Sequence, residues 1–192
     1  MNVKNVMAGV ALAVSMMCTL NLRAQVAPQE AFQQKLNLAG LFFMEPVEGK
    51  YKPLRKAADW YQQYDYAIRS RREKMEIRYL VEPWRENNPL SGVPHVRATQ
   101  LVMHLATNQG EGLIIGQNIG QETLLDDFNA DWGKVFYFEP KDAFSLNREC
   151  KLLVLHKGGL GTAYVFFLYD KITVELDKRF LALQFKNAGE EH

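Results

Sequence analysis

The sequence has little of several residue types that mark specialised classes of protein. Its 192 residues include two cysteines, four histidines, 13 glycines and seven prolines. These numbers exclude a disulfide-stapled, collagen-like or linker-dominated chain. No segment of about 20 to 50 residues repeats, which argues against a solenoid or a propeller. With 47% hydrophobic residues and no long run of one charge sign, the sequence predicts one compact globular domain.

Motifs for catalysis and metal binding are equally scarce. His95, His104 and His156 have none of the close spacings of a zinc site, and no Gly-x-Ser-x-Gly motif exposes a nucleophilic serine. The glycines at positions 158–161 lie between two strand-like runs and are not followed by a Lys-Ser/Thr pair. They therefore predict a hairpin turn and not a phosphate loop. We predict no cofactor and no metal ion.

One polar loop leaves a metal question open. Asp127, Asn129 and Asp131 supply oxygens at the first, third and fifth positions of a possible calcium loop. The sixth and twelfth positions are Trp132 and Phe138, where an EF-hand has Gly and Glu. The alternatives are a calcium site outside the EF-hand pattern and a polar turn whose side chains hydrogen-bond the backbone.

The first residues differ from the rest of the chain. Lys4 precedes an almost uncharged apolar run over residues 6–20, and a small residue, Ala24, ends the segment. This pattern predicts a signal peptide over residues 1–24 and a single domain over residues 25–192. An uncleaved anchor is the alternative, although the run is shorter than the roughly 20 residues of a spanning helix. We therefore expect an exported protein with no transmembrane span in its mature chain.

Cleavage after Ala24 has two consequences. Loss of Cys18 leaves Cys150 without an intramolecular disulfide partner, so stability must come from the apolar core. Loss of Lys4 and Arg23, from 23 basic and 22 acidic side chains, brings the net charge close to −1. That charge gives no electrostatic reason to expect nucleic acid as a partner.

The hydrophobic periodicity predicts an α+β fold, with an antiparallel sheet and a C-terminal β-hairpin packed against helices. Apolar residues recur at helical spacing over residues 56–71 and 95–108, and again in the tail from Thr173. Shorter runs, rich in β-branched and aromatic residues, predict strands. Residues 150–156 and 163–169 form the hairpin, and their lack of alternation implies that both faces are covered. The other predicted strands cover residues 41–44, 75–81 and 134–139.

A cluster of basic residues between positions 69 and 85, with aromatic neighbours, is the strongest candidate binding site. Arginine forks suit phosphate and carboxylate, and aromatic rings pack on sugars or cations. We therefore predict an anionic glycan, a lipid headgroup or an acidic envelope protein as the partner. The alternative is a solvated surface neutralised by Glu73, Glu76, Glu82 and Glu86, since such surface pairs need no functional reason. The predicted ligand-binding residues are Arg69, Arg72, Arg78 and Trp84.

The arrangement of elements resembles a known structural group. The predicted order is a long helix, antiparallel strands with a terminal hairpin and further helices, and residues 131–138, Asp-Trp-Gly-Lys-Val-Phe-Tyr-Phe, run into a strand. This order is similar to the Mog1/PsbP-like α/β sandwich over about residues 41–185. The resemblance implies a layered α/β fold. It transfers no functional residue, because that group includes unrelated binding and accessory roles.

Three functional hypotheses follow. The first is an exported, non-catalytic binding or accessory protein of the cell envelope. The second is a small secreted hydrolase in which His104 or His156 works with Asp127 or Asp131. The third is an assembly component that docks another envelope protein through exposed aromatic surface.

Overall fold

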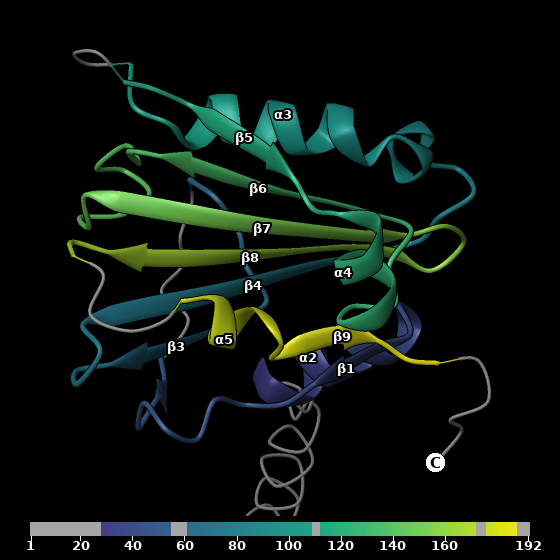
Figure 1. Cartoon of the computed structure of the whole chain (residues 1–192), viewed down its shortest axis with the longest axis horizontal. Helices are drawn as coiled ribbons and strands as arrows, with labels where there is room; N and C mark the ends of the chain where they lie inside the picture. The colour runs from purple at the N-terminus through teal and green to yellow at the C-terminus, as the bar shows by residue number, and fades with distance from the viewer. Residues whose placement is uncertain (1–27, 55–60, 109–111, 172–175, 188–192) are drawn as a thin grey trace, which may run out of the picture.

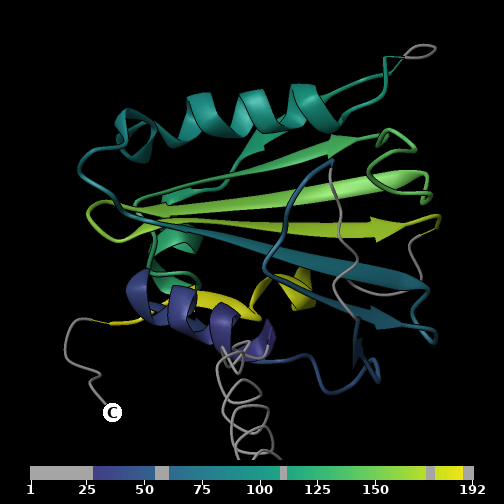
Figure 2. The ribbon, with the colours of Figure 1, turned by 180° about the vertical axis from the view of Figure 1, so that it is seen from behind.

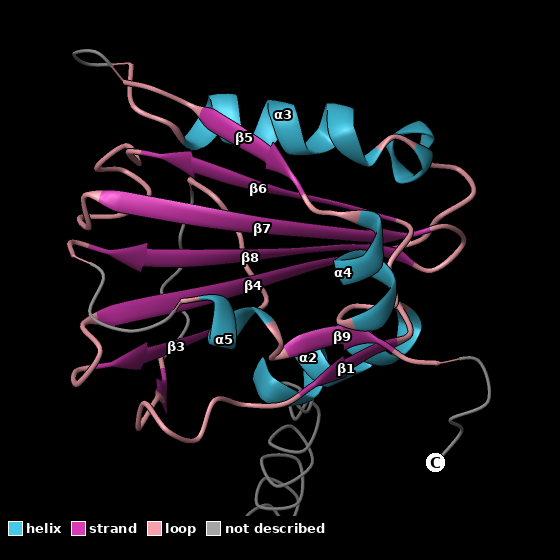
Figure 3. Ribbon diagram, in the orientation of Figure 1, coloured by secondary structure: helices cyan, strands magenta, loops and turns pink. Residues whose placement is uncertain are grey.

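The computed structural model describes residues 28–54, 61–108, 112–171 and 176–187. A seven-stranded sheet of order β2-β3-β4-β8-β7-β6-β5 dominates it, and each neighbouring pair of strands is antiparallel (Figure 1). Helices accompany this sheet, which confirms the predicted α+β class (Figure 3). The strands are β2 (Lys52–Pro53), β3 (Tyr66–Ser70), β4 (Met75–Pro83), β5 (Ile115–Asn118), β6 (Trp132–Phe138), β7 (Glu149–Lys157) and β8 (Gly161–Tyr169).

The β7–β8 hairpin is the centre of the sheet and confirms the prediction. Its turn places Gly159 and Gly161 at positive φ, which glycine adopts without steric cost. A side chain at Gly161 would also meet the Glu82 carbonyl oxygen at 2.5 Å from its Cβ. Every residue of β8 is buried, as is almost all of β7. Both faces of the hairpin are therefore covered, as the lack of alternation indicated.

Two apolar clusters cover the two faces of the sheet. On the face that we call the α2 face, the sheet packs against α2 (Pro28–Leu38), α4 (Gln121–Asp126), α5 (Asp177–Phe180) and a small antiparallel pair, β1 (Leu41–Phe43) with β9 (Leu183–Phe185). On the α3 face it packs against α3 (Pro94–Leu105). Figures 1 and 2 show the strands running between α3 and the α2, β1 and β9 group. Residues on alternate sides of each strand thus enter different cores.

The helix predicted over residues 56–71 is wrong where the structure can test it. Residues 55–60 lie outside the described part, and Tyr66–Ser70 form strand β3, paired with β4. Tyr66 and Ile68 face the α2 core while Arg69 faces outward. The two-residue alternation of this strand was hidden, because the aromatic residues before it share a helical spacing with residues of the strand. Pairing with the long strand β4 decides the conformation, since tertiary contacts outweigh local periodicity.

The tail also differs from its prediction. Residues 173–175 lie outside the described part, and the helix that follows is the single turn α5. Leu183, expected on the same helix as Leu176 and Phe180, instead belongs to β9 and pairs with Phe43 of β1. The predicted helix over residues 95–108 is confirmed as α3, and each remaining predicted strand appears within a residue or two of its expected bounds.

The predicted signal peptide, residues 1–24, lies outside the described residues. Within the part that the structure describes, none of the helices combines the length and the apolar character needed to cross a membrane.

Candidate functional site

Two of the four predicted ligand-binding residues line one cavity. Arg69, at the end of β3, and Arg72, in the β3–β4 turn, border a cavity of about 520 Å³ that Arg71 shares with them. The opposite wall is formed by β2 and by residues on either side of it. We call this cavity the basic groove, and its lining residues are Lys50, Lys52, Pro53, Leu54, Arg69, Arg71 and Arg72.

The register of the sheet brings like charges together in the groove. Lys52 of β2 stands directly opposite Arg69 of β3. Two cations at opposed positions repel each other and destabilise the pairing of the strands. An anion between them would relieve that repulsion.

Lys50, which lines the groove, has a backbone conformation that is sterically unfavourable for a residue with a side chain, as does Lys74 in the nearby turn. Lys50, in the loop before β2, has φ 51°, and Lys74, in the β3–β4 turn, has φ 50°. This left-handed region favours Gly or Asn over a long side chain. Holding lysines there costs free energy, and strain of this kind is concentrated at functional sites.

A buried polar cluster fixes the two walls of the groove to each other. The Glu73 carboxylate accepts hydrogen bonds from Arg179 of α5, at 2.6 Å from Nη2, and from the Tyr51 hydroxyl. The Ser70 hydroxyl donates to the carbonyl of Gly49 and accepts from the backbone N–H of Glu73. The loop before β2 is thereby joined to the β3–β4 turn by groups that are themselves buried.

The electrostatics of this cluster keep Glu73 ionised. Burial alone would raise the pKa of Glu73, but hydrogen bonds from Arg179 and Tyr51, with the charges of Arg179 and Arg72, bring the pKa below its ordinary value. Burial raises the pKa of Tyr51, and the neighbouring carboxylate raises it further. Tyr51 therefore stays a neutral donor, and Glu73 serves Arg179 and the fold.

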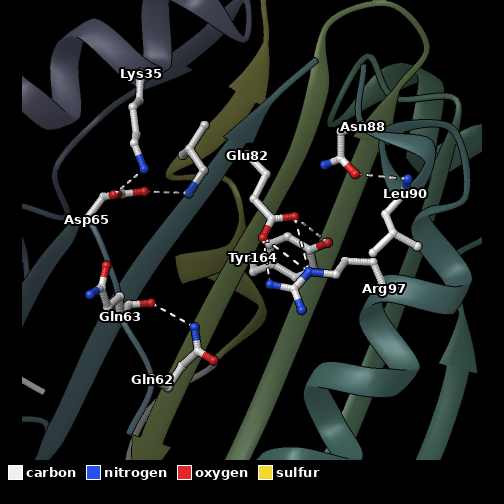
Figure 4. A network of polar contacts seen from close by, with 10 residues as sticks. Lys35, Gln62, Gln63, Asp65, Glu82, Asn88, Leu90, Arg97 and Tyr164 are labelled. Carbon is white, nitrogen blue, oxygen red and sulfur yellow. Dashed lines mark hydrogen bonds and ion pairs between the residues drawn. The ribbon is translucent and has the colours of Figure 1, made fainter. Parts of the chain in front are cut away.

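Of the glutamates that could neutralise the basic cluster, Glu82 and Glu73 pair with arginines outside it, whereas Glu76 pairs with two arginines of the cluster itself. Glu82 pairs with Arg97 of α3 at 2.9 Å and accepts a hydrogen bond from Tyr164 of β8, as Figure 4 shows. Glu76 lies 2.6 Å from Arg78 and 3.3 Å from Arg69. With Glu73 held by Arg179, cationic side chains outnumber carboxylates among the described residues of the groove.

Arg78 and Trp84 do not join Arg69 and Arg72 in the groove. Arg78 is on the α3 face with its side chain 12% exposed; it donates to the Phe144 carbonyl oxygen and lies over the Tyr64 and Phe144 rings. Trp84 follows β4, whose other end carries the β3–β4 turn. Nine strand residues separate two such ends by about 30 Å. The single four-residue patch is thus not formed, and ligand binding at Arg69 and Arg72 stays a prediction.

The histidines proposed for the hydrolase hypothesis have other partners. His104 Nε2 lies 3.1 Å from the Tyr61 carbonyl oxygen and its ring stacks on Tyr61. His156 Nδ1 lies 2.9 Å from the Thr162 hydroxyl. Burial lowers the pKa of His156, although the charge of Asp131 opposes that shift. Across the described residues, neither imidazole has a hydrogen bond to a carboxylate.

Two of the three residues of the possible calcium loop, Asn129 and Asp131, use their oxygens within the protein. The Lys157 ammonium donates to the side-chain and backbone oxygens of Asn129, and Asp131 accepts from the N–H of Gly158 at 2.7 Å. Asn129 has φ 48°, as in a tight turn. Among the described residues, no group of three His, Cys, Asp or Glu side chains is arranged to hold a metal ion. The geometry here is that of the polar turn.

Sequence reasoning missed the lysine wall of the groove. Lys50 and Lys52 are separated by about 20 residues from the arginines that they face. The signal was present as the alternation Lys-Tyr-Lys, in which Tyr51 is buried and both lysines are exposed. Nothing local indicated that this strand would pair with β3.

Comparison with known proteins gives no information on the function of this chain. The chain matches no family model, no curated protein and no solved structure. The resemblance to the Mog1/PsbP-like sandwich therefore stays a prediction based on the order of elements.

Proposed function

We propose that this chain is an exported, non-catalytic binding protein of the cell envelope, and that its basic groove holds an anionic ligand. The observation that carries the proposal is the composition of the groove: among the residues that the structure describes, five cationic side chains, two apolar ones and no carboxylate line it. The ligand chemistry that fits is a cluster of phosphate, sulfate or carboxylate groups, as in an acidic envelope glycan or a lipid headgroup.

Three features of the groove support binding over a merely solvated surface. Lys52 and Arg69 oppose each other in register, Lys50 has a strained backbone, and the walls are fixed by the buried Glu73 cluster. A site whose cations are already held in place loses less conformational entropy when the ligand binds. A solvated surface has no need of such a support.

The test is binding of two defined probes to the full chain. One probe is a fluorescent heparin oligosaccharide, followed by anisotropy, and the other is phosphatidylglycerol vesicles compared with phosphatidylcholine vesicles, followed by co-sedimentation. The groove variant is Arg71→Gln with Arg72→Gln. The matched control is Arg85→Gln with Lys186→Gln, which removes the same charge from exposed positions away from the groove.

We expect the groove variant to bind at least one probe about tenfold more weakly, equivalent to about 1.4 kcal/mol, while the control binds as the parent does. Binding should weaken as salt is added. Binding to heparin without binding to vesicles indicates a glycan, and the reverse indicates a headgroup. Equal losses in both variants, or no binding to either probe, would show that the groove is not a ligand site.

A further inference from the structure

A second cavity borders the basic groove at the end of the sheet where β3 turns into β4. It has a volume of about 340 Å³, and it shares Arg69 and Arg71 with the groove. We call it the turn cavity, and its lining includes Arg69, Arg71, Lys74, Glu76, Asn147 and Asp170. Because two arginines line both cavities, a ligand that contacts these arginines in the groove can extend into the turn cavity.

The walls of the turn cavity come from segments that are far apart in the sequence. Met75 of β4 pairs with Tyr169 of β8, which pairs in turn with Glu149 of β7. Asp170 follows β8 and Asn147 precedes β7, so both lie at the same end of the sheet as the β3–β4 turn. Figure 1 shows these strand ends together at one side of the molecule. The pairing of β4, β8 and β7 therefore builds the cavity.

The turn cavity differs from the groove in its charged groups. Arg69, Arg71 and Lys74 line it with positive charge, whereas Glu76 and Asp170 add carboxylates. Among the described residues that line the groove there are cations and no carboxylate. A dense cluster of anionic groups therefore suits the groove but not the turn cavity, where the carboxylates would repel it.

Two polar side chains of the turn cavity can bind an uncharged ligand group. The Asp170 side chain is exposed, and its Oδ1 accepts the backbone N–H of Arg148 at 3.1 Å. A carboxylate has about four lone-pair sites, so it can accept further hydrogen bonds. The Asn147 amide has two N–H donors and one acceptor oxygen, and it donates one N–H to Ser145 Oγ. Such groups beside cations suit a sugar acid, which has several hydroxyl groups and one negative group.

The two cavities together are wider than one anionic group. Lys52 of β2 lies opposite Arg69 of β3, and Arg69 lies opposite Glu76 of β4, which is followed in the sheet by β8. Three strand spacings therefore separate β2 from the end of β8 that precedes Asp170, a distance of about 14 Å. A single phosphate or carboxylate group occupies one cavity, whereas a chain of sugar units can occupy both.

We propose that the ligand is an acidic oligosaccharide that extends from the basic groove, past Arg69 and Arg71, into the turn cavity. Its acidic groups pair with the cations of the groove, and hydroxyl groups of the following sugar units donate hydrogen bonds to Asp170 and Asn147. This inference rests on the proposed function, because it takes the groove as the binding site. It names the ligand of that site as a glycan chain and not a lipid headgroup.

The test measures the binding of two labelled heparin oligosaccharides, a disaccharide and a hexasaccharide, to the full chain by fluorescence anisotropy. Asp170→Ala removes a hydrogen-bond acceptor of the turn cavity together with a negative charge. Its matched control is Asp142→Ala, which removes the same charge from an exposed position in the loop before β7 that lines neither cavity. Lys74→Gln is a second variant, and its control is the exposed Lys171→Gln, next in sequence to Asp170.

The ratio of hexasaccharide affinity to disaccharide affinity is the deciding quantity, because the disaccharide fills the groove alone. If charge alone governed binding, Asp170→Ala would raise this ratio, since a negative charge is removed. We expect the opposite, a ratio about fivefold lower than in the parent chain, because the chain loses hydrogen bonds to a charged acceptor. Lys74→Gln should lower the ratio by a similar factor, while Asp142→Ala and Lys171→Gln should leave it unchanged.

A ratio that is unchanged or raised in Asp170→Ala, or unchanged in Lys74→Gln, would overturn the inference. Binding to phosphatidylglycerol vesicles without binding to the hexasaccharide would overturn it as well. In each of these cases, weaker binding of the disaccharide or the vesicles by the groove variant Arg71→Gln with Arg72→Gln would still support the groove as a ligand site. Failure of this inference is thereby distinguished from failure of the proposed function.

Discussion

Arg179 pairs with Glu73 in the buried cluster that joins the two walls of the groove, so its removal is the most direct test of that cluster. Its Nη2 and Nε lie 2.6 Å and 3.3 Å from the two oxygens of Glu73, and the side chains are 11% and 6% exposed. Breaking a buried ion pair by removing one partner costs about 3–5 kcal/mol, because the other charge stays buried. For Arg179→Met we expect a loss of about 3 kcal/mol at pH 7, since the Tyr51 hydroxyl still donates to Glu73.

The loss should depend on pH in a defined direction. In the parent chain the pKa of Glu73 is lowered, so its contribution to stability is present above the ordinary carboxyl pKa and is lost as the pH falls below it. In Arg179→Met the burial of Glu73 is no longer outweighed, and its carboxyl takes up a proton at higher pH. Once protonated it no longer buries a charge, so near pH 4 the difference between the two chains should shrink to about 1 kcal/mol.

The assay is urea unfolding followed by tryptophan fluorescence at pH 7 and pH 4, with the m-value checked for constancy. The double variant Glu73→Gln with Arg179→Met closes a cycle, and contact pairs of this kind couple by about 0.5–3 kcal/mol. The reasoning is refuted if the loss is the same at both pH values, or if the two substitutions are additive at pH 7.

Two further predictions concern buried groups outside the sites. The Tyr79 hydroxyl is buried without a hydrogen-bond partner among the described residues. Tyr79→Phe should therefore leave the free energy of unfolding unchanged or raise it by about 1 kcal/mol. A decrease of about 1 kcal/mol or more in the same urea assay would show that the hydroxyl has a partner. Burial raises the pKa of the Cys150 thiol, which is 1% exposed, so iodoacetamide should modify Cys150 in urea but not in native buffer at pH 8. Peptide mass spectrometry measures this modification, and rapid labelling of the native chain would contradict the structure.

Local signals in the sequence predicted the elements that depend on near neighbours. The β7–β8 hairpin is joined by a short glycine turn, and α3 contains its own apolar stripe. The conformations of β3 and β9 depend instead on pairing with other strands. Strand β9 pairs with β1, which lies about 140 residues earlier, and β3 is held by β4 against a helical pattern that continues into it. A search for local periodicity cannot detect such partners.

The positions of the candidate site residues also depend on contacts that are distant in the sequence. Arg69, Arg72 and Arg78 look alike in the sequence, but the first two line the groove, whereas Arg78, on the same face of the sheet as Arg69, packs against Phe144.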